Sequence, residues 1–287
     1  MLLTVHRSLF TGHFKMKFFI SLLLIFVSFV IYIRWIEMTA VFSPSKNIKR
    51  TPTDVGVEYE DVYFQTKDKF NINGWLVKGA SDDVVIFFHG NSGTMGSAIS
   101  KVKMFHELGL TVFMIDYRGF GRSEGTPTEM GLYRDAQAAY DYLLSRPDVN
   151  MYHVVIYGES LGGAVAIDLA GRNRSCGVIV DAAFTNLLDM AQIRYPYIPA
   201  FLVGAQFDSL SKVVSIEEPK IFIHSRDDEV VPFQLGKNLY DAAVQPKEFY
   251  EVEGKHNTND PAGVETIRRV FEHFLEKYKN SCPSLNR

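Results

Sequence analysis

From about residue 57 onwards, short runs of β-branched and aromatic residues alternate with helical segments, and this alternation constrains the fold most strongly. The runs are almost continuously apolar, which is typical of strands buried on both faces of a sheet. Such strands, separated by helices, form a mostly parallel sheet with helices on both sides. The expected parallel strands are residues 84–88, 111–115, 154–157, 178–180, 220–223 and 248–252.

Two further strands precede the parallel part. Residues 57–66 and 70–77 are separated by three charged residues and predict an antiparallel hairpin. Together the segments predict an α/β fold with a mostly parallel eight-stranded sheet. The clearest helix start has Thr126 as the N-cap, Pro127 at the first helical position and Glu129 as the capping-box residue.

The N-terminal region contains an uncharged run, FFISLLLIFVSFVIYI, at residues 18–33. If Arg34 extends its charge towards the lipid headgroups, the apolar stretch reaches roughly 20 residues, which is enough to span a bilayer. A cleaved signal peptide is the alternative, but the run is longer than a usual signal core and Met38-Thr39-Ala40 matches the small-x-small cleavage pattern poorly. Basic residues flank both ends almost equally, so the orientation stays open, with a cytoplasmic N-terminus preferred.

The expected organisation is a tail (1–17), a transmembrane anchor (18–36), a linker (37–55), one catalytic domain (56–280) and a short tail (281–287). The 30 basic and 33 acidic side chains give a net charge of −3 without a basic run, which argues against nucleic acid as a partner. Cys176 and Cys282 are too few for a disulfide framework or a zinc site, and whether they are bridged stays open.

The pentapeptide GESLG around Ser160 fits the pattern G-x-S-x-G. An apolar strand precedes it and an alanine-rich helix follows, so the serine is expected on a strained strand-to-helix turn. Glycine is needed on either side because a side chain would crowd so tight a turn. The amides at the start of the helix would point towards negative charge that develops near the hydroxyl. We therefore expect Ser160 to be a nucleophile.

A serine nucleophile needs a histidine base and a carboxylate that orients the base, and on an α/β sheet these follow the serine in the order acid, then histidine. The loop after strand 220–223 offers Asp227 and Asp228, and Asp181 at the end of an earlier strand is a third candidate for the acid. The loop after strand 248–252 offers His256. His273 competes for the role of base, but it lies within the pattern of the last helix, so His256 is preferred.

Two more motifs follow apolar strands: His-Gly-Asn at residues 89–91 and DYRGFGRS at residues 116–123. With these motifs and the serine turn, the chain from about residue 57 to 279 resembles the α/β-hydrolase-fold serine hydrolases, in particular the membrane-anchored α/β-hydrolase-domain proteins. The resemblance implies that the backbone amides of Asn91 and Leu161 form an oxyanion hole. It also favours Asp228 as the acid, because the family's acid precedes a proline by four positions, and it makes His89 structural.

Residues 183–216 interrupt the alternation of strands and helices and are rich in aromatic residues. The segment predicts either a small cap or a surface excursion with one packing helix. As a cap, it would lie over Ser160 and accept an acyl chain through Tyr195, Tyr197, Phe201 and Phe207.

The expected function is hydrolysis of an acyl ester or thioester, with a small-molecule or lipid-like acyl substrate and the membrane, through the N-terminal helix, as partners. An aminopeptidase-like or small-ester hydrolase is the alternative, and a non-enzymatic scaffold of the same fold is a third possibility because a fold alone does not prove activity. The sequence contains neither a metal-ligand cluster nor a nucleotide-binding loop, so no cofactor is implied.

Overall fold

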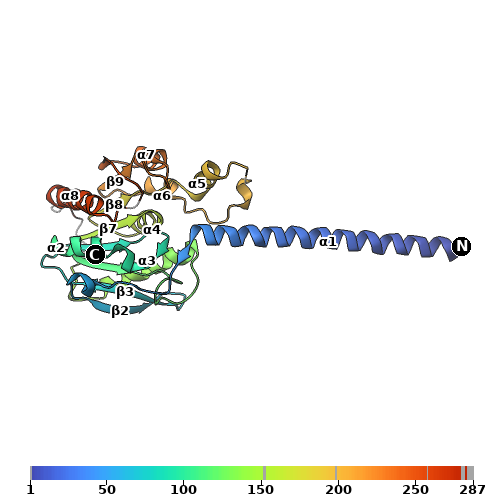
Figure 1. Cartoon of the computed structure of the whole chain (residues 1–287), viewed down its shortest axis with the longest axis horizontal. Coiled ribbons are helices and arrows are strands. Elements are labelled where there is room, and N and C mark those ends of the chain that lie inside the picture. Colours follow the sequence, from blue (N-terminus) through green and yellow to red (C-terminus); the bar gives the residue numbers. More distant parts are fainter. Residues whose placement is uncertain (1, 151–152, 198, 257, 279–281, 283–287) are drawn as a thin grey trace.

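The computed structural model describes residues 2–150, 153–197, 199–256, 258–278 and 282. One long helix, α1, leads away from an α/β domain (Figure 1). It begins at Leu2 and ends at Val41, beyond both ends of the expected anchor. Within it, Lys15–Val41 is long and apolar enough to cross a membrane.

Eight strands form one sheet in the order β10-β9-β8-β7-β4-β6-β3-β2. Strands β2 and β3 are the predicted antiparallel hairpin, β3 also pairs antiparallel with β6, and the other neighbours are parallel. The mostly parallel eight-stranded sheet predicted from the sequence is therefore confirmed. The strands are β2 (Glu60–Gln65), β3 (Asn71–Val77), β4 (Val84–Phe88), β6 (Thr111–Ile115), β7 (Val154–Glu159), β8 (Gly177–Asp181), β9 (Lys220–Ser225) and β10 (Lys247–Val252).

Helices pack on both faces of this sheet. One apolar core lies between the sheet and α3, α4 and α7, and the other lies between the sheet and α2 and α8. The helices of the domain are α2 (Ile99–Glu107), α3 (Glu129–Leu144), α4 (Leu161–Ala170), α5 (Leu187–Arg194), α6 (Ser209–Val213), α7 (Phe233–Ala242) and α8 (Pro261–Tyr278), with 3-10 turns η1 (Pro52–Val55), η2 (Met95–Ala98) and η4 (Ala200–Leu202).

The start of α3 differs from the expected capping box. Thr128, and not Thr126, is the N-cap, and its hydroxyl accepts a hydrogen bond from the Gly131 amide at 3.1 Å. Glu129 does not reach back to the helix end. Its carboxylate instead accepts hydrogen bonds from the amides of Gln206 and Phe207, at 2.7 and 2.9 Å. For Glu129, a long-range contact with the segment between β8 and β9 therefore replaces the expected capping-box hydrogen bond.

Two connections tie the ends of the chain to the domain. The short strands β1 (Ser43–Pro44) and β5 (Ser92–Gly93) pair in parallel directly after α1, and the Ser43 amide donates to the Asn91 carbonyl at 2.9 Å. A disulfide joins Cys176, just before β8, to Cys282 in the C-terminal tail. The first connection places the exit of α1 beside the loop that follows β4.

Candidate active site

Ser160 lies at the turn between β7 and α4 with φ 56° and ψ −118°. A positive φ is strained for a residue with a side chain, and such strain tends to be kept at functional sites. The turn depends on its glycines: a Cβ at Gly158 would overlap the Gly162 carbonyl, and a Cβ at Gly162 would overlap the Phe88 carbonyl. The backbone thus holds the Ser160 hydroxyl at the carboxyl end of the central strands.

The structure brings Ser160, His256 and Asp228 together from three separate loops. His256 Nε2 lies 3.0 Å from Ser160 Oγ, and His256 Nδ1 lies 2.8 Å from Asp228 Oδ2. The other candidates for the acid and the base lie elsewhere. Asp227 is exposed, and His273, on α8, has its Nε2 3.0 Å from the Glu248 carboxylate of β10. An unbroken chain of hydrogen bonds runs from the carboxylate through the imidazole to the hydroxyl.

Asp228 is held by more than His256. Its Oδ1 accepts hydrogen bonds from the amides of Val230 and Val231, at 2.9 and 2.7 Å. Its Oδ2 also faces Nε2 of the buried His224 at 3.4 Å, a nitrogen that lies 2.9 Å from the Val231 carbonyl. The sequence indicates only a packing role for His224, and nothing local in it predicts the contact with Asp228. These contacts orient the carboxylate towards the imidazole.

The electrostatics of the pair follow from this geometry. Burial raises the pKa of Asp228, but hydrogen bonds from His224 and His256 outweigh it and hold the pKa well below the usual range. Burial lowers the pKa of His256, but the hydrogen bond and the negative charge of Asp228 outweigh this and raise the pKa above 6.5. Asp228 is therefore ionised at neutral pH, and His256 is a stronger base than a free histidine.

The two residues expected to form an oxyanion hole flank the serine turn. Leu161 is the first residue of α4 and directly follows Ser160. Asn91 follows Gly90, and a Cβ built on Gly90 would be 3.7 Å from the Ser160 Cβ. The loop after β4 thus lies against the serine, and its Asn91 carbonyl is occupied by the Ser43 amide.

Asp181, the third candidate for the acid, belongs to a buried cluster behind the serine turn. Its Oδ2 accepts hydrogen bonds from the hydroxyls of Tyr157 and Thr258, at 2.9 and 3.0 Å. Lys101 from α2 completes the cluster, with its Nζ 2.9 Å from Glu159, 3.5 Å from Asp181 and 2.7 Å from the Thr258 hydroxyl. The cluster joins Glu159, the residue before Ser160, to the loop that carries His256.

We expect Lys101→Met to destabilise the protein by about 3–5 kcal/mol, because the change leaves two carboxylates buried without their cation. Chemical denaturation of the full chain in detergent measures this change in unfolding free energy. Lys103→Met is the matched control: Lys103 lies two residues further along α2, its side chain is 50% exposed, and its ion pair with Glu107 spans 3.7 Å. Surface pairs of this kind contribute about 0–1 kcal/mol. Equal effects of the two changes would contradict a stabilising cluster.

The loops after β4 and β6, which carry the motifs at residues 89–91 and 116–123, are held by buried and half-buried pairs. Asp116 accepts a hydrogen bond from the Met95 amide at 2.7 Å, and His89 Nε2 lies 3.4 Å from its Oδ1. Arg118 pairs with Asp135 at 2.8 Å and with Asp68 at 2.9 Å. These contacts connect the loops after β4 and β6 to each other and to α3.

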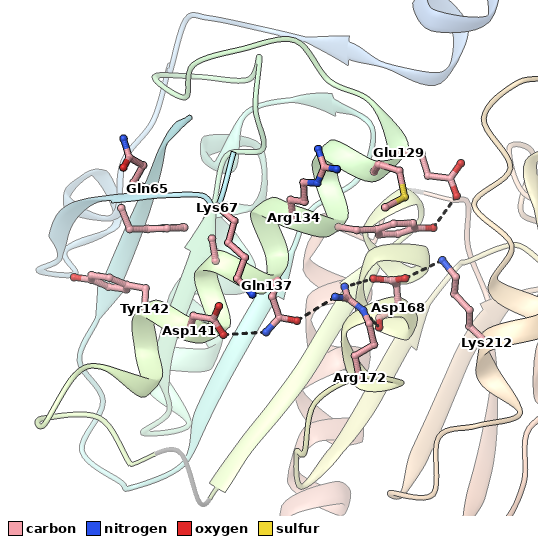
Figure 2. A pocket seen from close by; sticks show the side chains of 14 residues that line it. Gln65, Lys67, Glu129, Arg134, Gln137, Asp141, Tyr142, Asp168, Arg172 and Lys212 are labelled. Atoms are coloured by element: carbon pink, nitrogen blue, oxygen red, sulfur yellow. Dashed lines mark hydrogen bonds and ion pairs between the residues drawn. The ribbon is translucent and has the colours of Figure 1, made fainter. Parts of the chain in front are cut away.

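A cavity of about 670 Å³ lies away from Ser160, between α3, α4 and α6 (Figure 2). Several of its polar side chains pair with one another: Gln137 bonds Asp141 and Arg172, and Asp168 pairs with both Arg172 and Lys212. It contains neither the serine nor the histidine. The candidate catalytic residues therefore lie at the serine turn and not in this cavity.

Comparison with known proteins agrees with this architecture. Residues 79–206 match the family described as serine aminopeptidase, S33. The α/β hydrolase domain-containing protein WAV2 of Arabidopsis thaliana is 33% identical over 258 residues, which cover 82% of this chain and 84% of WAV2. Protein bem46 of Schizosaccharomyces pombe is 33% identical over 247 residues, 82% of each chain.

Solved structures give the same fold. An esterase of Pyrococcus furiosus superposes with a TM-score of 0.72 at 21% identity, covering 83% of this chain and 98% of the esterase. The esterase domain of a Rhodothermus marinus protein superposes with a TM-score of 0.60 at 19% identity, over 77% of this chain and 99% of that domain. The fold, the motifs and the relatives lead to one conclusion: the chain is a hydrolase that belongs to the α/β-hydrolase-domain family.

Proposed function

We propose that the chain is a membrane-anchored serine hydrolase that cleaves an acyl ester or thioester, with Ser160 as nucleophile, His256 as base and Asp228 as the orienting acid. The observation that carries the proposal is the continuous hydrogen-bonded path from Asp228 through His256 to Ser160, which ends on a strained turn. Hydroxyl, imidazole and carboxylate in this order form the arrangement that activates a serine.

In the proposed reaction, Ser160 Oγ attacks the carbonyl carbon while His256 Nε2 takes the hydroxyl proton. The amides of Asn91 and Leu161 stabilise the oxyanion that forms. The C–O or C–S bond then breaks, and His256 returns the proton to the leaving alcohol or thiol. Water then attacks the acyl carbon while His256 takes one of its protons. The acid leaves as the C–Oγ bond breaks and His256 returns that proton to Ser160 Oγ. Asp228 stays ionised throughout and stabilises the imidazolium, in line with the raised pKa of His256.

We infer that α1 spans the membrane and that the domain lies on the oxidising side of it. The support is the Cys176–Cys282 disulfide, because protein disulfides persist in oxidising compartments. Glycosylation at the Asn173-Arg174-Ser175 sequon would also indicate which side of the membrane the domain occupies. It is a poor indicator, because the Asn173 amide group already donates hydrogen bonds to Gln137 and to the Leu169 carbonyl.

The orientation is tested by thiol labelling of protein taken directly from cells. We expect a maleimide-polymer to shift the protein only after reduction, because both thiols are bridged. A Cys176→Ser/Cys282→Ser variant is the control that shows no shift in either state. Two reactive thiols without reductant would place the domain in a reducing compartment.

The proposed substrate carries a lipid-like acyl group, since a bilayer concentrates such molecules near the anchored domain. Each methylene buried in an acyl pocket contributes about 0.8 kcal/mol. We therefore expect kcat/KM on nitrophenyl esters to rise a few-fold per added carbon from acetate upwards, until the pocket is full. A rate that stays flat from acetyl to long-chain esters would count against a lipid-like substrate.

The match to the serine aminopeptidase family supports a second candidate, cleavage of a peptide amide. Aminoacyl-nitroanilides measured beside the ester series distinguish the two. Turnover of the nitroanilides together with a flat ester series would favour the peptidase.

A further inference from the structure

The segment between β8 and β9 exposes several large apolar side chains within nine residues. Ile193, Tyr195, Tyr197 and Phe201 are all exposed, and the last two, at 77% and 75%, are the most exposed large apolar residues described after Val41. We call these four the cap surface. Phe207 differs, because it is fully buried against the rings of Phe42 and Tyr133. Scattered apolar residues are normal on a surface, but a cluster in one short segment marks an interaction site.

The cap surface lies beside the exit of α1. Turn η4 contacts α1, and Phe42, just after the helix, packs on Phe207 with ring centroids 6.1 Å apart. Gly204 lies so close to Arg34 that a Cβ would overlap the guanidinium group. Figure 1 shows that α5 and the chain after it reach out of the domain in the direction that α1 takes. The apolar helix and the cap surface therefore point to the same side of the molecule.

The level of the cap along α1 corresponds to the edge of a bilayer. The uncharged run of α1 ends just before Arg34, which is seven residues from Val41 and so about 10 Å along the helix axis. Tyr32 and Trp35 stack at this level with centroids 6.2 Å apart. Aromatic and basic side chains concentrate at the membrane–water interface. Because Gly204 touches Arg34, the cap extends to the same depth.

The composition of the cap suits lipid headgroups. Between Ile193 and Gly204 the only charged residue is Arg194, and basic residues are attracted to anionic lipids. The covalent link through α1 keeps the cap at the interface permanently, so its apolar side chains meet lipid at a high effective concentration. A soluble protein partner would have to compete with that arrangement.

We propose that the cap surface inserts into the headgroup region of the same bilayer that α1 spans, so that the site receives an amphiphilic acyl substrate directly from the membrane. The proposal rests on the function proposed above and adds the source of the substrate. The exit of α1 lies beside the loop that packs on Ser160, as the Ser43–Asn91 hydrogen bond shows. The serine edge of the sheet therefore faces the lipid.

Docking is tested by fluorescence, independently of catalysis. Both cysteines are bridged, so an introduced cysteine is the single free thiol. Full-length Tyr197→Cys and Phe201→Cys, labelled with the polarity-sensitive dye NBD, are placed in nanodiscs that contain phosphatidylcholine and phosphatidylglycerol. Val244→Cys is the control, because Val244 is 42% exposed but precedes β10. It therefore lies at the amino ends of the parallel strands, whereas Ser160 lies at their carboxyl ends. We expect headgroup-level nitroxide lipids to quench the dye several-fold at positions 197 and 201 and little at 244.

Two outcomes of this experiment would overturn the docking. Quenching at 197 and 201 no stronger than at 244 would show that the cap stays in water. A blue-shifted emission without nitroxide quenching would show a protein partner or a second copy on the cap surface. Release of the full-length protein by alkaline carbonate would also overturn it, because α1 would not be an anchor.

A second measurement tests the consequence for the substrate. In a Tyr197→Glu/Phe201→Glu variant, kcat/KM on a long-chain ester in vesicles should fall by about tenfold or more, because two charges oppose insertion. Hydrolysis of a soluble acetate ester should not change, and Val244→Glu should affect neither. Equal loss on both esters would overturn delivery from the membrane. If the unmutated protein hydrolyses neither ester, the proposed function fails, and the quenching result still decides the docking by itself.

Discussion

Ser160→Ala is expected to lower ester turnover by about a millionfold and to abolish labelling by a fluorophosphonate probe. The reason is that the hydroxyl is the proposed nucleophile and lies 3.0 Å from its base. Alanine retains the Cβ, so the turn with its positive φ meets no new contact and the unfolding free energy should change by less than about 1 kcal/mol.

The control for this change is Ser92→Ala, since Ser92 is exposed on the loop beside the site. It should keep both turnover and labelling. Labelling that persists in Ser160→Ala would place the nucleophile elsewhere. Loss of labelling with a marked loss of stability would mean that the turn had unfolded, and thermal unfolding separates the two cases.

Asp228→Asn is expected to lower kcat by about ten-thousandfold, because an amide cannot hold the proton of His256 on Nδ1 and stabilise the imidazolium. Asp227→Asn is a matched control one residue away: the Asp227 side chain is exposed, whereas Asp228 accepts from His256 at 2.8 Å. The opposite ranking would assign the acid to Asp227, and loss in neither variant would direct attention to Asp181.

The same pair of variants predicts a pH effect. Only the neutral imidazole accepts the serine proton, so kcat/KM falls as the pH decreases through the pKa of His256. That pKa is raised above 6.5, and the hydrogen bond and charge of Asp228 are what raise it against burial. The acid limb of kcat/KM in the unmutated protein should therefore lie above pH 6.5. It should move to lower pH in Asp228→Asn and stay in place in Asp227→Asn.

Helix α1 and the candidate site are linked through one short segment of the chain. The chain passes from Val41 into β1, whose partner β5 directly follows the loop that lies against Ser160. The Gly121 amide also donates to the Ser45 carbonyl at 2.8 Å, so the loop after β6 holds the same segment. The orientation of the site relative to α1 is thus set by backbone hydrogen bonds and not by a free linker.

Much of the fold could be predicted from the sequence because its signals are local. The continuous apolar runs and the polar breaks between them depend on backbone sterics and on burial of each strand, and they predicted every strand of the sheet. The serine turn was also recognisable, because only glycine permits so close an approach of strand and helix around Ser160.

Contacts between distant parts of the chain could not be predicted in this way. Adjacent aspartates look alike in sequence, and the loop that turns Asp228 towards His256 separates them only in three dimensions. Lys101 reads as a surface residue of an amphipathic helix until the sheet places two carboxylates beside it. Glu129 reads as a local cap, but it binds amides 77 and 78 residues away. The sequence by itself determined which segments are strands, helices and a membrane-length apolar run, because neighbouring residues decide that. The tertiary structure alone decided which charges meet and where the segment between β8 and β9 lies against α1, because both depend on how the strands are ordered in the sheet.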